Sequence, residues 1–163
     1  MKITFTLISF MLLFFCLLGC MPTAKPPLPD TINIIPPSPD VSPEIAAFSG
    51  IWEGKWGEDQ KTIIVVEKID NQKAEIIFSR EKFRAGSSGF MGDASYNYFK
   101  MSVLPGPILE WRNDARPATN PEGYYQCPCK LTLEMAKDKD VLIAYWEYTD
   151  YKYKKRADLR RRQ

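Results

Sequence analysis

The sequence predicts an all-β domain of about eight antiparallel strands that form a small up-and-down barrel, after an N-terminal signal helix and a proline-rich tether. Two observations predict this fold. Short runs rich in Val, Ile, Tyr, Phe and Trp alternate with turn signals between residues 47 and 163. Two of these runs also alternate between apolar and polar positions, and closing such a sheet into a barrel removes its exposed edges.

Turn signals divide the domain into candidate strands. Three of the connections are short turns, at 70–72, 105–107 and 137–140, and two are longer polar loops. The candidate strands are 48–57, 61–69, 73–80, 96–104, 108–113, 124–136, 141–149 and 151–160. Residues 42–48 have room for one helical turn. A single domain of this length buries about two thirds of its unfolded surface, which is enough for a core without metal or disulfides.

Alternation identifies the inward face of two strands. In strand 48–57 the even positions are Phe48, Gly50, Trp52, Gly54 and Trp56. In strand 124–136 the apolar odd positions are Tyr125, Cys127, Cys129, Leu131, Leu133 and Met135. One face of each strand therefore lies in the core and the other in water. Glycines on an inward face suit a sheet that bends sharply to close.

The chain begins with one positive charge at Lys2 and an apolar run over residues 3–18. A positive start, a short apolar segment and a small residue before the cut are the parts of a secretory signal, and the run is short for a membrane span of about 20 residues. The run ends in Leu17-Leu18-Gly19-Cys20, which resembles the lipobox of bacterial lipoproteins. The alternative is an uncleaved N-terminal helix with an incidental cysteine.

The lipobox resemblance implies that residues 1–19 are a signal peptide and that cleavage occurs before Cys20. It also implies a diacylglyceryl thioether on Cys20 and an acyl chain on its new amine, which together anchor the protein to a membrane. Met21 follows the cysteine, in place of the Asp that directs retention in the inner membrane. We therefore expect a cell-envelope protein, on the outer membrane facing the periplasm if the host is Gram-negative.

Residues 20–46 are predicted to be a tether. Eight of the thirteen prolines lie between residues 21 and 46, which excludes a continuous helix and favours extended polyproline conformations. At about 3.1 Å per residue, such a spacer can hold a domain up to about 80 Å from the membrane. The alternative is a proline-rich ligand for a partner protein.

The charge balance speaks against nucleic acid as a partner. The formal net charge of the whole chain is +2, and removing residues 1–19 takes away Lys2. The resulting near-neutral chain offers no global basis for binding nucleic acid. Basic residues gather at the C-terminus, against Asp158 alone, at Lys152, Lys154, Lys155, Arg156, Arg160, Arg161 and Arg162. This basic tail fits anionic headgroups or, as we favour, a solvated strand edge whose charges block aggregation.

The chain contains no histidine. This excludes Ser-His and Cys-His nucleophile pairs, histidine general bases and imidazole metal ligands. We therefore predict a protein that is not an enzyme and that uses no metal or cofactor. The carboxylates Glu67, Glu110 and Glu134 are the remaining candidates for a catalytic role.

The segment Gly50-Ile51-Trp52-Glu53-Gly54-Lys55-Trp56, followed by 66–69 and 74–78, resembles small lipocalin-like (calycin-type) domains of bacterial envelope proteins. The resemblance covers about residues 48–160. In lipocalins the Trp of the Gly-x-Trp motif closes one end of the barrel beneath an Arg from the last strand. Arg156 and Arg160 are the candidates for that Arg here.

The resemblance implies a cup for a small apolar or amphipathic molecule, with Trp52 and Trp56 as candidate ligand contacts. A barrel of eight strands can equally be filled by its own side chains. Because large aromatic residues prefer the interior, closure of the barrel and core packing are the favoured roles of both tryptophans.

Cys127-Pro128-Cys129 is the motif with reactive atoms. In an oxidising envelope, Cys127 and Cys129 invite a disulfide. Strand residues i and i+2 lie about 6.6 Å apart, at the limit of disulfide geometry, so the bond requires a local break that Pro128 can supply. The alternatives are an easily reduced redox pair and, as we favour, two buried small residues or an inert bridge.

The loop over residues 80–95 contains Gly86-Ser87-Ser88-Gly89 and three large apolar residues, Phe83, Phe90 and Met91. A flexible glycine-rich loop with apolar side chains suits a lid over the mouth of a barrel or a docking point for a partner. Phe83, Phe90 and Met91 are therefore candidate ligand contacts. The loop lacks the Gly-Lys-Ser/Thr of a phosphate loop.

Two functions remain in view. The first is a non-enzymatic lipoprotein whose barrel binds a small apolar or amphipathic ligand, or serves as an envelope scaffold, and it predicts a cavity wide enough for a ligand. The alternative is a protein-interaction module, an inhibitor or accessory subunit of an envelope enzyme, which predicts a filled barrel with an exposed apolar loop patch. The expected partners are a membrane through the lipid on Cys20 and a small hydrophobic ligand or an envelope protein.

Overall fold

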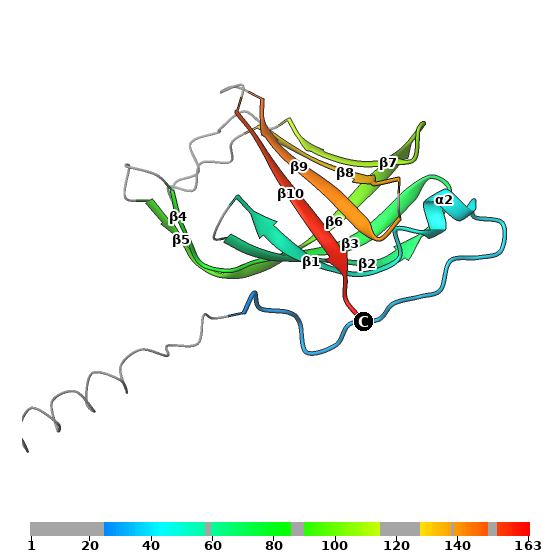
Figure 1. Ribbon diagram of the computed structural model, residues 1–163, viewed down its shortest axis with the longest axis horizontal. Coiled ribbons are helices and arrows are strands. Elements are labelled where there is room, and N and C mark those ends of the chain that lie inside the picture. Colours follow the sequence, from blue (N-terminus) through cyan, green and yellow to red (C-terminus); the bar gives the residue numbers. More distant parts are fainter. Residues whose placement is uncertain (1–24, 58–59, 86–89, 115–127, 138, 150–152) are drawn as a thin grey trace, which may run out of the picture.

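The computed structural model describes residues 25–57, 60–114, 128–137, 139–149 and 153–163, with 86–89 left out. Within these residues, eight antiparallel strands close into a barrel in the order β1-β10-β9-β8-β7-β6-β3-β2 (Figure 1). The strands are β1 Gly50–Trp56, β2 Gln60–Ile69, β3 Lys73–Arg80, β6 Ser95–Leu104, β7 Ile108–Asn113, β8 Cys129–Met135, β9 Val141–Tyr148 and β10 Tyr153–Arg161. The predicted all-β, up-and-down barrel is confirmed.

The loop predicted over residues 80–95 has structure of its own. Two short strands, β4 Phe83–Ala85 and β5 Phe90–Gly92, pair as a separate two-stranded sheet between β3 and β6. Figure 1 shows this hairpin projecting beyond one end of the barrel. The apolar residues of this stretch lie on short strands because they flank the glycine-rich centre, as in a hairpin.

A short helix covers the other end of the barrel. Helix α2 spans Pro43–Ala46, and the side chain of its N-cap, Ser42, accepts a hydrogen bond from the amide of Ile45 at 3.4 Å. Ser at the N-cap and Pro in the first turn both favour a helix start. The helix leads into Phe48, which is fully buried in the core. We call this end of the barrel the closed end.

The segment over residues 26–41, here called the strap, lies on the outer face of β2 and β3. Leu28 and Ile32 pack against a cluster of outward-facing residues, Ile63, Val65 and Ile77. The amide of Ile35 donates to the carbonyl of Glu67 at 2.7 Å, beside the register shift between Val66 and Lys68. The strap crosses the barrel from the side of β4 and β5 to α2 (Figure 1).

This course differs from the extended spacer predicted for residues 20–46. The physical reason lies in β2, where Ile63-Ile64-Val65-Val66 is apolar on both faces of the strand. One apolar face of β2 packs inside the barrel. The other would be exposed to water, and apolar residues of the strap, which lie between the prolines, bury it. The prolines keep the strap extended, which allows it to follow the strands.

Trp52 and Arg161 lie together at the closed end of the barrel. Trp52 is fully buried, and its Nε1 donates to the carbonyl of Phe48 at 2.8 Å. The guanidinium of Arg161 lies 4.2 Å from the centre of the Trp52 ring. It donates to the carbonyls of Ser49 at 2.6 Å and Ala47 at 2.7 Å.

The prediction that Arg156 or Arg160 covers the closing Trp was therefore wrong, because Arg161 does so. Both are exposed on the outer face of β10, because side chains of a strand alternate between faces and Arg161 has the opposite parity. The register of β1 and β10 places Arg161 opposite Trp52. Alternation correctly predicted the inward face of β1, where Trp52 and Trp56 are both buried.

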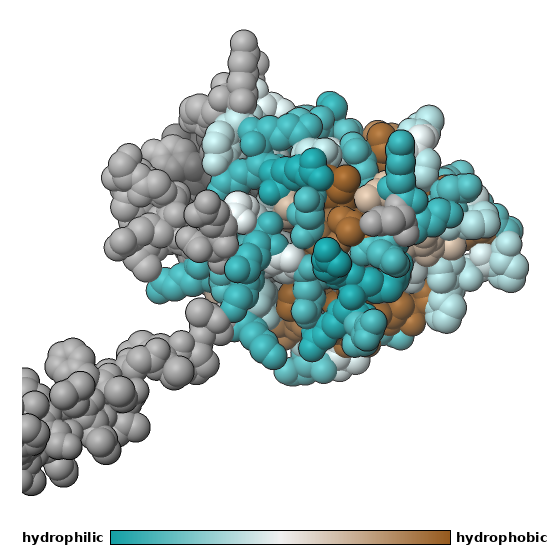
Figure 2. Space-filling view, in the orientation of Figure 1, coloured by the Kyte–Doolittle hydropathy of each residue, from teal (hydrophilic) through white to brown (hydrophobic). Residues whose placement is uncertain are grey.

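Five of the basic C-terminal residues, Lys154, Lys155, Arg156, Arg160 and Arg161, lie in the last strand of the barrel, and Lys152 lies outside the described residues. β10 pairs with β1 on one side and β9 on the other. Its outward cations are partly neutralised: Arg156 pairs with Asp158 at 2.8 Å and Lys154 with Glu147 at 3.0 Å. Figure 2 shows a largely hydrophilic surface over these strands. The favoured role of protecting an open edge was therefore wrong, because closure leaves β10 no free edge.

Glu147 links three strands on this outer face. Its carboxylate binds Lys130 of β8 at 2.7 Å and Lys154 of β10 at 3.0 Å. The hydrogen bonds from Lys130 and then Lys154 lower the pKa of Glu147 below its ordinary value. A carboxylate with a lowered pKa in the folded state stabilises the fold above the pKa of the unfolded chain, about 4.3, and this contribution is lost as the pH falls through the folded-state pKa.

We expect Glu147→Gln to lower the free energy of unfolding by about 1 kcal/mol at neutral pH, since the two ion pairs are partly exposed. The difference from wild type should shrink as the pH is lowered from about 5 to about 2. Urea denaturation across this range measures it. Glu75→Gln, at an exposed position of β3, is the matched control and should change stability by less than about 0.5 kcal/mol. A pH-independent loss in Glu147→Gln would contradict the prediction.

Candidate functional site

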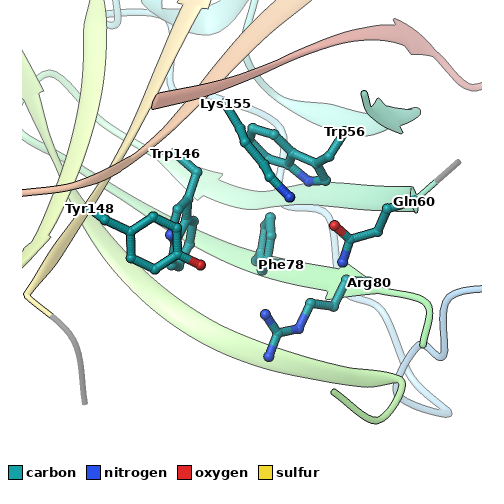
Figure 3. Close-up of a pocket in the computed structure, with 7 residues that line it drawn as sticks. All are labelled: Trp56, Gln60, Phe78, Arg80, Trp146, Tyr148 and Lys155. Carbon is teal, nitrogen blue, oxygen red and sulfur yellow. The ribbon is translucent and has the colours of Figure 1, made fainter. Parts of the chain in front are cut away.

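A small cavity lies at the end of the barrel opposite α2, here called the open end. Five of the strands that meet at this end supply its lining: β1, β3 and β9 finish here, and β2 and β10 begin here. The cavity has a volume of about 40 Å³. Figure 3 shows its lining: Trp56, Gln60, Phe78, Arg80, Trp146, Tyr148 and Lys155.

Aromatic rings form the floor and walls of the cavity. Phe78 lies at the centre, with the ring of Trp146 stacked on it at 5.6 Å and the ring of Trp56 edge-on at 6.3 Å. The row continues into the barrel, because Phe99 stacks on Phe78 at 5.9 Å and Trp111 on Phe99 at 4.3 Å. Such a row offers a broad, rigid apolar surface on which planar or hydrocarbon groups can pack.

Two buried indole N–H groups line this cavity without an acceptor among the described residues. The indole Nε1 atoms of Trp56 and Trp146 are both buried, and neither has an acceptor among the described residues. Trp56 is only 5 % exposed. A buried donor without an acceptor costs about 1–3 kcal/mol, so two such groups lining one cavity call for an explanation. An acceptor that enters the cavity from outside would satisfy them.

The charged groups of the cavity are positive. Arg80 of β3 and Lys155 of β10 line it with Gln60 and Tyr148, and none of the seven described lining residues is acidic. Burial lowers the pKa of Arg80, while the nearby Tyr148 raises it. The guanidinium nevertheless stays protonated at neutral pH, because arginine ordinarily keeps its proton far above neutral pH. The cavity therefore favours an anion or an acceptor-rich group.

The size of the cavity limits what it can hold. A volume of about 40 Å³ has room for about three water molecules, whereas small-molecule sites usually span about 300–1,000 Å³. Fully buried side chains pack the core of the described barrel, among them Leu109, Leu133 and Leu159. The cavity can therefore take the polar end of a molecule or one side chain, with the remainder outside the barrel.

A wider depression of about 520 Å³ lies on the outer face of β1 and β10, over Gly54. Its walls are charged side chains such as Lys55, Arg156 and Asp158. Arg156 and Asp158 already pair with each other, and no buried unpaired donor of the described residues lines it. The open end is therefore the stronger candidate site.

The structure brings together only some of the residues predicted from the sequence. Trp56 lines the cavity, whereas Trp52 lies in the core beside Phe48 and Arg161 and does not line it. Phe83, Phe90 and Met91 lie on β4 and β5 beyond the open end. The side chains of these last three lie outside the description.

The cysteine predictions fall partly outside the described residues. Cys129 begins β8 and is buried, in register with Asn113 and Tyr148. Cys20 and Cys127 both lie outside the described residues. The lipid on Cys20 and the Cys127–Cys129 disulfide therefore remain predictions.

Most lining residues of the cavity were not singled out by the sequence. Trp146 and Tyr148 stand two apart on β9, and Phe78 and Arg80 stand two apart on β3. Because residues two apart in a strand share a face, this spacing is a usable signal for residues that point inward at the same strand end. The register of the strand pairs around the barrel decides which of these inward-facing residues come together.

Comparison with protein-family models, curated proteins and solved structures found no match to this chain. Among the described residues, no group of three or more His, Cys, Asp or Glu side chains is placed to hold a metal ion. No helix in the described part of the chain is both long enough and apolar enough to cross a membrane.

Proposed function

We propose that this protein is a non-enzymatic, lipid-anchored envelope protein whose lipocalin-like barrel binds a small amphipathic molecule at its open end. The observation that carries the proposal is the pair of buried indole N–H groups, from Trp56 and Trp146, on one cavity. The ligand inserts a polar or anionic end between these donors. Its apolar body packs against the aromatic rings and extends beyond the barrel.

The chemistry of the cavity supports an acceptor-rich or anionic end group. A carboxylate or phosphate oxygen accepts hydrogen bonds from both indoles and gains from the charges of Arg80 and Lys155. Hydrogen bonds to charged groups contribute about 1.5–3 kcal/mol each. An uncharged hydrocarbon would leave the donors unsatisfied and would bind less tightly.

The membrane anchor is the second part of this proposal. Leu17-Leu18-Gly19-Cys20 supports acylation of Cys20, and several acyl chains give a stable anchor where one alone does not. The closed eight-stranded barrel and the stack of Arg161 on Trp52 support the lipocalin-like relationship. The expected location is the envelope, facing the periplasm from the outer membrane if the host is Gram-negative.

The small volume of the cavity favours one alternative. A space of about 40 Å³ also suits the carboxylate of a partner's Asp or Glu side chain. The protein is then an inhibitor or accessory subunit of an envelope enzyme, and it uses the open end as its contact surface. The two functions differ in what copurifies with the barrel.

Native mass spectrometry of the mature protein, released from its membrane in mild detergent, tests the proposal. We expect an additional mass of a few hundred daltons that is lost on denaturation, which also identifies the ligand class. A bare barrel, or a barrel bound to another protein, would contradict ligand binding, and the second outcome would support the interaction module.

Trp56→Phe and Trp146→Phe each keep a ring and remove a donor. We expect each to lower affinity for the copurified ligand about tenfold, which corresponds to about 1.4 kcal/mol. Trp111→Phe is the matched control, because Trp111 belongs to the same row of rings but does not line the cavity. Isothermal titration calorimetry measures all three, and equal losses in the three variants would contradict the assignment of the donors.

A further inference from the structure

The strap fixes where the chain leaves the barrel on its way to Cys20. Pro26 is buried, the hydroxyl of Ser79 donates to the carbonyl of Pro27, and Leu28 packs on the outer face. Ser79 precedes Arg80, the last residue of β3, at the open end. The chain therefore departs from the open end of the barrel, on the side opposite α2 (Figure 1).

This attachment shortens the link to the membrane. Six residue steps separate Cys20 from Pro26, and a chain spans at most about 3.3–3.6 Å per residue, or about 20 Å here. The full tether over residues 20–46 could have reached about 80 Å. A lipid on Cys20 thus holds the barrel close to the bilayer, with its open end nearest.

The surface at the open end has the composition of a membrane contact. Tyr96, Tyr98 and Tyr153 are 40 %, 63 % and 49 % exposed. Tyr96 lies opposite Ser79 in the register of β3 and β6, beside the point where the strap begins. Its ring packs edge-on against that of Tyr98 at 6.0 Å. Tyrosine rings favour the membrane interface, where one end is apolar and the other is wet.

We propose that the open end docks on the surface of the lipid bilayer, with Tyr96, Tyr98 and Tyr153 at the level of the headgroups. The proposal rests on the lipid anchor of the proposed function. The short link brings this end to the membrane, and the tyrosine rings then bind at the bilayer interface. The cavity lined by Trp56 and Trp146 then opens towards the bilayer, so a ligand with an acyl or aromatic body can enter from the membrane.

The test uses the full acylated protein in vesicles of phosphatidylcholine and phosphatidylglycerol that contain a small fraction of phosphatidylethanolamine with a photoreactive headgroup. Crosslinked peptides are mapped by mass spectrometry. We expect lipid crosslinks around Lys82, Tyr96, Tyr98 and Tyr153, and none at α2 or at the closed-end turn containing Lys139. Even labelling of both ends, or labelling of the closed end, would overturn the orientation.

Two variants, both with the short link unchanged, test whether the tyrosines themselves contribute to the membrane contact. Tyr96→Ser combined with Tyr98→Ser should lower the crosslink yield at the open end at least threefold. Ile34→Ser combined with Ile35→Ser changes two exposed apolar residues of the strap away from that end, and the yield should stay the same. An unchanged yield in the tyrosine variant would overturn the proposed contact surface. Thermal unfolding verifies that both variants are folded.

The same experiment distinguishes failure of the lipid anchor from failure of the docking, which rests on that anchor. A chain that neither carries acyl groups on Cys20 nor floats with the vesicles overturns both the anchor and the docking. An acylated chain that floats with the vesicles but is crosslinked at α2 overturns the docking alone. Ligand copurification is measured separately and depends on neither result.

Discussion

Replacing Trp52 by alanine is expected to lower the free energy of unfolding by about 3–5 kcal/mol, the usual cost of removing a fully buried large aromatic side chain. Trp52 is 0 % exposed. Its loss leaves a cavity at the closed end and removes the donor that satisfies the carbonyl of Phe48. Urea denaturation of the chain from Met21 onward, followed by circular dichroism, measures the change.

Arg161 provides the partner for this test. Arg161→Ala should cost about 2 kcal/mol, because it removes a cation–ring contact and two hydrogen bonds to carbonyls. Arg160→Ala, one residue earlier but exposed on the outer face, should cost less than about 0.5 kcal/mol. In a double-mutant cycle, Trp52 and Arg161 should couple by about 1 kcal/mol. Equal costs at Arg160 and Arg161 would contradict the closure described above.

Gly54→Ala should lower the free energy of unfolding by about 3 kcal/mol. A Cβ at this position would collide with the backbone carbonyl oxygen of Asp158 and lie 3.0 Å from the Cα of Leu159. Both atoms belong to the backbone of β10, so they cannot turn aside as a flexible side chain would. The substitution therefore forces β1 and β10 apart where the barrel closes, and overpacking of this kind costs about 1–3 kcal/mol or more.

Gly57→Ala is the matched control for Gly54→Ala. No atom of the described residues lies within 4 Å of a Cβ added at Gly57, but its φ of +63° is a conformation that side chains disfavour. We expect a cost of about 1 kcal/mol from backbone strain alone. Urea denaturation of both variants compares steric exclusion with strain. A smaller loss at Gly54 than at Gly57 would show that the two strands tolerate separation.

The strands were predictable because their signal is local. Alternation in the predicted strand 48–57 identified Phe48, Trp52 and Trp56 as inward-facing, and all three are buried. The side-chain period of a strand is two, whatever the strand pairs with, so a few neighbouring residues reveal which face is apolar. The same rule, applied to β10, separates Arg160 from Arg161 but does not say which of them meets Trp52.

The cavity was much less predictable. Trp56 was predicted as a ligand contact, whereas Phe78 and Arg80 were not, although both lie on a strand that the sequence predicted. Lys155 was named only as part of the basic tail. These residues meet because they lie near the ends of five strands that line one cavity at the open end. Their convergence depends on the stagger of every strand pair around the barrel, which no single segment encodes.

The sequence by itself determined that the chain forms an all-β domain and which residues of β1 point inward, because side-chain alternation and turn chemistry are local properties. The tertiary structure alone decided that Arg161 covers Trp52, that Trp56 and Trp146 line one cavity, and that the strap lies on β2 and β3. Each of these contacts joins segments far apart in the chain. Their pairing is set by barrel closure and by the need to cover the apolar outer face of β2.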